Sequence, residues 1–153
     1  MRSAILWLHV LCGVVWVGAS ASFVLAASAL STESGEWREF ALSVAPRINR
    51  ISLVVAAIIP VTGIGNLIYV GLARQYVFPP EFIGILAAKI ALYTTMVLAL
   101  VAAWHAEARL RSASDGCGGG ARAELRRLIW LYGATVASGV AALALGLWLS
   151  GVK

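Results

Sequence analysis

The sequence predicts an all-α integral membrane protein, folded as a four-transmembrane-helix up-and-down bundle with both termini on the periplasmic side. Hydrophobic residues make up 61% of the 153 residues and charged residues only 12%, about half the charged fraction of an ordinary soluble domain. A soluble domain of this length has too little polar surface to cover so many apolar side chains. Two further observations specify the bundle: four apolar segments are long enough to cross a bilayer, and arginines gather in alternate connections between them.

The four predicted spans cover most of the chain. The first runs over residues 3–27, the second over 48–73, the third over 82–105 and the fourth over 128–150. Each exceeds the roughly 20 residues that an α-helix needs to cross the hydrocarbon core. Because the connections are short, consecutive helices are expected to be antiparallel neighbours, and residues 1–153 form a single four-span membrane domain.

Local residues refine the second and fourth spans. Pro60 removes a backbone donor and clashes with the preceding turn, so it predicts a kink in the second span. Small residues follow it at 62–66, and Gly139 and Gly146 occur in the fourth span. Small side chains at these positions favour the close approach of neighbouring helices.

The first and third connections are predicted as segments outside the spans. The first, residues 31–45, mixes acidic residues with Trp37 and Phe40, which predicts that residues 33–40 lie along the membrane surface. The third, residues 107–127, is rich in arginine and glycine. Both are short enough to join antiparallel helices directly.

The basic residues predict the orientation. Eight arginines lie in or beside the first and third connections: Arg38, Arg47, Arg50, Arg109, Arg111, Arg122, Arg126 and Arg127. The opposite side carries only Arg2, Arg74 and Lys153. This asymmetry places the first and third connections in the cytoplasm and both termini outside. It also accounts for the net charge of +5 without a nucleic-acid partner, since no basic face is interleaved with aromatic residues.

Three polar side chains are predicted to share one level in the outer half of the bilayer. His9, Asn66 and Lys89 each lie about two turns inside the outer end of their span. Polar groups at membrane depth are costly, so they usually face a partner or a cavity rather than lipid. At 100° per residue, Cys12 and Trp16 lie on the same face of the helix as His9, one and two turns along. We therefore expect an outer-leaflet pocket lined by His9, Cys12, Trp16, Asn66, Lys89 and Tyr93.

These residue types suit two kinds of ligand. Imidazole and sulfur are the ligands that Cu(I) prefers, so His9 is the main candidate metal ligand, with Cys12 or Met96 assisting. Zinc fits less well, because a set of four ligands is hard to assemble here. Lys89 either extends outward to the membrane surface or faces the interior, where an anionic ligand such as a propionate would pair with it.

Structural roles remain open for the same residues. His9 is also consistent with a hydrogen bond to Asn66 or to a backbone carbonyl, and Cys12 and Met96 with plain packing. His105 lies at the opposite surface, so His9 and His105 are not expected to ligate one haem iron. The sequence contains no Ser-His-Asp arrangement, carboxylate pair or dinucleotide fingerprint, so no catalytic residues are predicted.

The spans resemble those of the copper-resistance protein D (CopD) family. The resemblance rests on LH at residues 8–9 with VWVG at 15–18, RINRIS at 47–52 with VTGIGN at 61–66, and LAAKIAL at 86–92. It implies a bacterial inner-membrane protein of copper uptake or tolerance that binds copper through His9. Family members often have eight spans and this chain matches the last four, which implies a homodimer or a partner membrane chain.

The sequence is also similar to the HemJ-type protoporphyrinogen oxidases, which share a first-span histidine and a third-span lysine. His9 and Lys89 match these positions, but the family's Tyr-His pair and its YLPR stretch are missing, with residues 98–100 and 20–23 in their places. This resemblance implies the alternative function, a membrane oxidoreductase that binds haem b or a porphyrin. A third hypothesis is a non-catalytic accessory subunit, in which the His9 stripe packs against another membrane chain and binds nothing.

Overall fold

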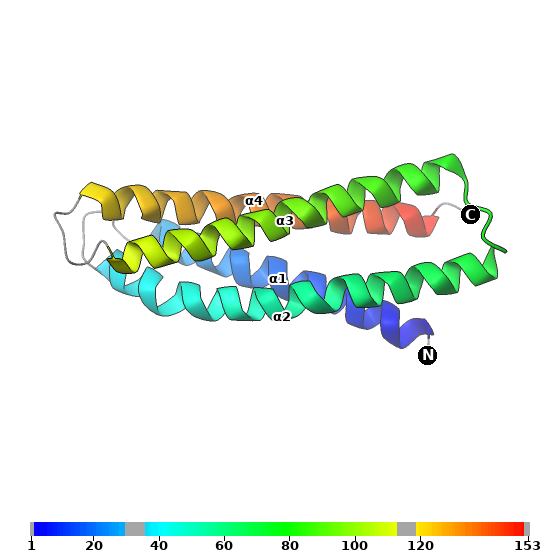
Figure 1. Ribbon diagram of the computed structural model, residues 1–153, viewed down its shortest axis with the longest axis horizontal. Coiled ribbons are helices and arrows are strands. Elements are labelled where there is room, and N and C mark those ends of the chain that lie inside the picture. The colour runs from blue at the N-terminus through cyan, green and yellow to red at the C-terminus, as the bar shows by residue number, and fades with distance from the viewer. Residues whose placement is uncertain (1, 30–35, 113–118, 152–153) are drawn as a thin grey trace.

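The protein is a bundle of four long helices (Figure 1). The computed structural model describes residues 2–29, 36–112 and 119–151, and this part of the chain contains no strand. The helices are α1 (Arg2–Ala29), α2 (Glu36–Ala73), α3 (Pro80–Ser112) and α4 (Gly119–Gly151). They run up and down alternately, and the start of α1 and the end of α4 lie at the same end of the bundle. The predicted four-helix architecture is confirmed.

All four helices are long and apolar enough to cross a membrane. Each contains an 18-residue window with a mean hydropathy between 1.8 and 2.2, and at most 28% of any such window is buried within the chain. Large apolar side chains therefore point outward, among them Trp7, Val61, Leu98 and Trp130. A soluble bundle shows the opposite pattern, with charged and polar residues on its outer face.

The helices are longer than predicted at the arginine-rich end. α2 already begins at Glu36, inside the predicted connection 31–45, and α3 and α4 extend into the predicted connection 107–127 as far as Ser112 and Gly119. The apolar pattern ends where charges begin, but Ala, Glu and Arg are strong helix formers and continue the helices. Residues 30–35 and 113–118 lie outside the described residues.

The prediction that residues 33–40 lie along the membrane surface is wrong from Glu36 onward. Trp37 is buried inside the bundle, and its Nε1–H donates to the carbonyl oxygen of Ala27 at 2.9 Å. That carbonyl lies in the last turn of α1, where backbone oxygens lack a helical partner. Trp37 thus ties the end of α1 to the start of α2. Residues 33–35 lie outside the described residues.

Helix ends follow local chemistry. Glu36 and Glu39 occupy the first turn of α2, and α3 begins at Pro80 with Glu81 in its first turn. Acidic side chains are favourable at the positive end of a helix, and proline suits the first helical position. Arg111 lies in the last turn of α3, where a cation is favourable.

Packing is concentrated in two buried clusters. The first, at the arginine-rich end, contains Phe23, Ala27, Trp37, Ala41, Ala45, Ile48, Ala103, Ala106, Leu110, Leu128 and Tyr132. The second, near the middle, contains Cys12, Trp16, Val55, Ala56, Met96 and Leu100. Gly139 brings α4 close to α1, because a Cβ there would overlap a methyl group of Val17. Few side chains are buried at the end of the bundle that holds both chain termini. His9 and Lys89 lie at this end.

Candidate functional site

His9 is held by α2 through one ring nitrogen. Its Nδ1 lies 2.9 Å from Oγ1 of Thr62 and 3.2 Å from the carbonyl oxygen of Ile59. The ring also packs on Gly63, where an added Cβ would come within 3.3 Å of Cε1. The absence of a side chain at Gly63 thus lets the imidazole lie against α2.

A hydrogen bond from His9 to the Ile59 carbonyl requires one particular tautomer of the ring. The Ile59 carbonyl can only accept a hydrogen bond, so Nδ1 must carry the proton. The Thr62 hydroxyl lies 3.0 Å from the carbonyls of Ile58 and Ile59 and donates to them, so its oxygen accepts from Nδ1 as well. Nε2 is left with its lone pair, and no described residue hydrogen-bonds it. Metal-binding histidines commonly have this arrangement, with the non-ligating nitrogen fixed by a second hydrogen bond.

The predicted hydrogen bond between His9 and Asn66 is absent, whereas the predicted bond to a backbone carbonyl is present. Asn66 lies one turn beyond Thr62 on α2 and is half-buried. Counting turns predicted that His9 and Asn66 lie at the same depth. The observed partner, Thr62, lies one turn away from Asn66, so a difference of one turn decides which side chain bonds His9. Thr62 was not singled out because threonine is common in apolar helices, where it bonds its own backbone.

Lys89 lies at the same end of the bundle as His9. Its side chain extends from α3 toward α4, whereas His9 extends from α1 toward α2. The side chain is half-buried, and a Cβ on Gly146 of α4 would lie 3.2 Å from its Nζ. No described acidic residue forms an ion pair with Lys89. The ammonium group therefore lies beside Gly146 of α4.

The sulfur-containing candidates lie one level deeper. Cys12 and Met96 are 6% and 5% exposed and belong to the same buried cluster as Trp16. Trp16 meets the ring of Tyr93 edge-on, with 6.3 Å between centroids and 83° between planes. The hydroxyl of Tyr93 donates to the carbonyl of Ala56 at 2.8 Å. The predicted residues thus form two adjoining layers, His9 and Lys89 above, and Cys12, Trp16, Tyr93 and Met96 below.

The donor set limits the metals that this region can bind. In the part of the chain that the structure describes, no three side chains of His, Cys, Asp or Glu gather in one group. A tetrahedral zinc site needs such a group. A site built on His9 would have to use few ligands or include a thioether.

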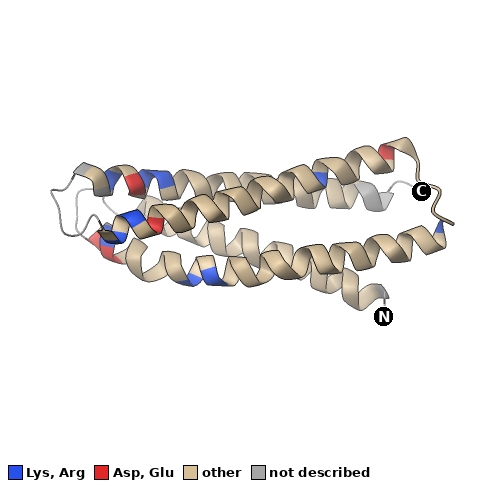
Figure 2. Cartoon of the chain, in the orientation of Figure 1, with Lys and Arg blue, Asp and Glu red and all other residues tan. Residues whose placement is uncertain are grey.

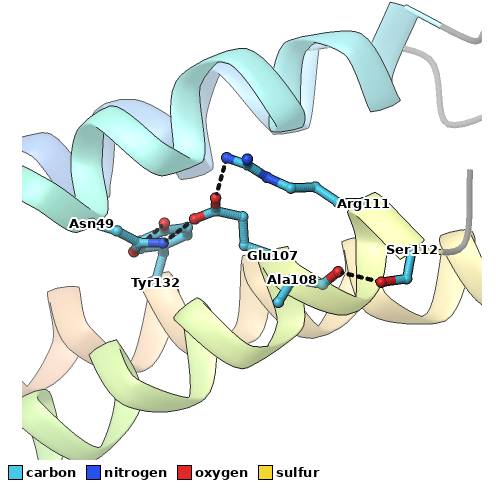
Figure 3. A network of polar contacts seen from close by, with 6 residues as sticks. All are labelled: Asn49, Glu107, Ala108, Arg111, Ser112 and Tyr132. Carbon is cyan, nitrogen blue, oxygen red and sulfur yellow. Dashed lines mark hydrogen bonds and ion pairs between the residues drawn. The ribbon is translucent and has the colours of Figure 1, made fainter.

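A second polar cluster lies at the arginine-rich end and was missed by the sequence analysis (Figure 3). Nδ2 of Asn49 donates to Oε2 of Glu107 at 2.7 Å, and the hydroxyl of Tyr132 donates to Oδ1 of Asn49 at 2.9 Å. Arg111 pairs with Oε1 of Glu107 at 2.6 Å. Asn49, Tyr132 and Glu107 are all buried. Three helices, α2, α3 and α4, are joined by this cluster.

One signal in the sequence marks this cluster. Asn49 and Ser52 lie on the same helical face as Val55 and Ala56, one and two turns along. The face is buried throughout. Asn49 lies at the start of the predicted second span, between Arg47 and Arg50, and was not singled out as a core residue.

Two surface hollows among the described residues are lined by side chains other than the predicted pocket residues. One, between α2 and α3 at the arginine-rich end, is lined by Pro46, Asn49, Arg50, Trp104, Glu107, Ala108 and Arg111. The other, between α1 and α4, is almost wholly apolar and is lined by Ala21, Val24, Leu25, Gly133 and Val136.

No protein-family model, curated protein or solved structure matches the chain.

Proposed function

We propose that the protein spans a bacterial inner membrane four times, with the arginine-rich end in the cytoplasm and both termini outside. Outward-facing apolar side chains on all four helices support insertion. Figure 2 shows charged residues gathered toward one end of the bundle, with long uncharged stretches beyond them. Arginine and lysine are retained on the cytoplasmic side of membrane proteins.

Within that membrane we propose that the protein handles copper, by binding Cu(I) through Nε2 of His9. The observation that carries this proposal is the pair of hydrogen bonds that fix the proton on Nδ1. They leave Nε2 as a lone-pair donor with a defined orientation. The resemblance of the spans to the CopD family supports the same metal.

Cys12 and Met96 complete the proposed donor set. Both are buried in the same cluster, one level below His9, and thiolate and thioether sulfur select Cu(I) over harder ions. Cu(I) bound by one thiolate carries no net charge. The complex therefore adds no uncompensated charge to an apolar interior, where such a charge would be costly.

The test is a Cu(I) titration of detergent-purified protein against a competing chelator. The parent should bind Cu(I) stoichiometrically, and His9→Ala should abolish that binding. His105→Ala is the matched control, because His105 is an exposed histidine on α3 toward the arginine-rich end of the bundle. Thr62→Val should keep the site but weaken it by about 10- to 100-fold, since it removes a hydrogen bond to the ligand. Unchanged binding in His9→Ala would end the assignment.

Lys89 favours a second candidate function, haem b or porphyrin binding by a membrane oxidoreductase. Its side chain is half-buried and its ammonium has no described acidic partner. A carboxylate of a bound porphyrin would supply the missing anion, with His9 as axial ligand or proton carrier. An absorption spectrum separates the two: a Soret band lost in His9→Ala supports haem, and copper without such a band supports the first proposal.

The third candidate, an accessory subunit, predicts neither copper nor a Soret band. In that case the apolar outer faces would cover another membrane chain. A homodimer or a partner chain is also compatible with copper handling, because the exposed apolar side chains suit lipid and protein equally. Cross-linking in the native membrane, followed by sizing of the products, distinguishes a homodimer from a complex with a different chain.

A further inference from the structure

The hollow between α2 and α3 at the arginine-rich end is separate from the His9 region. It measures about 250 Å³ and is open to the outside along one side. Its polar lining comes from Asn49, Arg50, Glu107 and Arg111, and its apolar lining comes partly from Trp104. No part of the proposed copper or porphyrin function uses it.

The charges around the hollow do not cancel. Both oxygens of Glu107 are already occupied, Oε2 by the amide of Asn49 and Oε1 by Arg111. Arg50 is exposed, and no described residue pairs with its guanidinium. Among the described residues that line the hollow, the positive charge of Arg50 is therefore left without a partner. A ligand that completes this site should be an anion.

The position of the hollow indicates what kind of anion reaches it. Trp104 is 46% exposed, and tryptophan collects at the level of lipid headgroups, with its ring in the apolar layer and its N–H toward water. Beyond Arg50, α2 has no charged residue until Arg74, and α3 has none between Lys89 and Glu107. The hollow therefore lies where the charged end of the bundle meets the uncharged stretch. In the proposed orientation this level is the headgroup layer of the cytoplasmic leaflet.

We propose that this hollow binds the phosphate group of an anionic phospholipid. Arg50 would bind the phosphate oxygens through its planar guanidinium, which matches phosphate geometry. Arg111, oriented by its ion pair with Glu107, lies in the same lining. Basic pockets between membrane helices on the cytoplasmic side suit such headgroups. The proposal rests on the membrane orientation proposed above, but not on the ligand at His9.

Native mass spectrometry of the detergent-purified protein tests the proposal. The parent is titrated with phosphatidylglycerol and with zwitterionic phosphatidylcholine, and Arg50→Gln is compared with Arg126→Gln. Arg126 is an exposed arginine at the same end, on α4, and does not line the hollow. Phosphatidylglycerol should bind the parent and Arg126→Gln equally and Arg50→Gln about fivefold more weakly, the effect of one basic residue at an anionic surface. Phosphatidylcholine should bind all three weakly.

Each other outcome decides a different point. Equal weakening in both variants would mean that net charge alone attracts the lipid, and would overturn the site. Displacement of phosphatidylglycerol by millimolar inorganic phosphate, with the same dependence on Arg50, would retain the phosphate site but assign it to a soluble ligand. Thermal unfolding of Arg50→Gln should match that of the parent, because the replaced side chain is exposed. Copper binding should be unchanged in Arg50→Gln, so failure here and failure at His9 are distinguishable.

Discussion

Asn49 is the centre of the buried polar cluster because both ends of its amide are used. Its Nδ2 donates to Glu107 and its Oδ1 accepts from Tyr132. A buried polar group that loses its partner costs about 1–3 kcal/mol. Asn49→Ala leaves both Glu107 and Tyr132 without this hydrogen-bond partner, so we expect a loss of about 3 kcal/mol in the free energy of unfolding. Tyr132→Phe strands only one acceptor and should cost about 1–2 kcal/mol.

Reversible unfolding of the purified protein in mixed detergent measures both losses. Asn66→Ala is the control, because Asn66 is half-buried and belongs to no described hydrogen-bonded cluster; it should change stability by about 0.5 kcal/mol or less. If Asn49→Ala costs no more than Asn66→Ala, the cluster does not stabilise the bundle.

Single residues also show where sequence reasoning stops. Depth along a helix follows from counting turns, which brought His9 and Lys89 to neighbouring levels. Partner choice depends on which way each helix is rotated and on shifts of one turn, and neither is encoded in the spacing of one helix. For that reason Thr62 replaces Asn66 as the partner of His9, and Glu107, the first residue of the predicted connection 107–127, is buried.

At the scale of one element, α2 continues through Pro60 with help from α3. Proline has no N–H, so the carbonyl of Ala56, four residues earlier, loses its helical donor. The hydroxyl of Tyr93 donates to that carbonyl at 2.8 Å. Proline is tolerated in membrane helices when a neighbouring side chain satisfies the carbonyl in this way.

This replacement predicts a coupling between the two residues. Tyr93→Phe should cost about 1 kcal/mol in the free energy of unfolding, because it leaves the Ala56 carbonyl unpaired. In a Pro60→Ala background the backbone N–H returns, and the same change should cost less than half as much. A double-mutant cycle on unfolding free energies measures the difference. An identical cost in both backgrounds would show that the hydroxyl does not substitute for the missing donor.

Element number and type were predictable, whereas element ends were not. Four long apolar runs specify four helices, since only a helix satisfies all of its own backbone groups in a membrane. The ends of the apolar runs indicate where the chain leaves the bilayer, and not where the helix ends. α2 starts a full twelve residues before the predicted span at 48, because Glu, Arg and Ala extend a helix as well as apolar residues do. Trp37 was misplaced for the same reason.

At the scale of the whole molecule, the two ends of the bundle differ in chemistry. The arginine-rich end has the larger buried cluster and the Asn49 network. The opposite end holds His9 and Lys89 among half-buried side chains. Ligand exchange needs a part of the bundle that opens locally, and such parts have few buried contacts. The loosely packed end, proposed to face outward, therefore suits a site that receives its ligand from outside the cell.

The orientation itself predicts which end reacts with a reagent that cannot cross the membrane. Cys117 is first replaced by Ser, and Cys12 is buried and should stay unreactive. Single cysteines are then placed at Val77, which is 74% exposed between α2 and α3, and at Ser112, exposed at the end of α3. An impermeant maleimide should label Val77→Cys in intact spheroplasts and Ser112→Cys only after lysis. Lysed spheroplasts should label both equally, which controls for reactivity. Labelling of Ser112→Cys alone in intact spheroplasts would invert the bundle, placing the His9 end in the cytoplasm and the phosphate hollow in the outer leaflet.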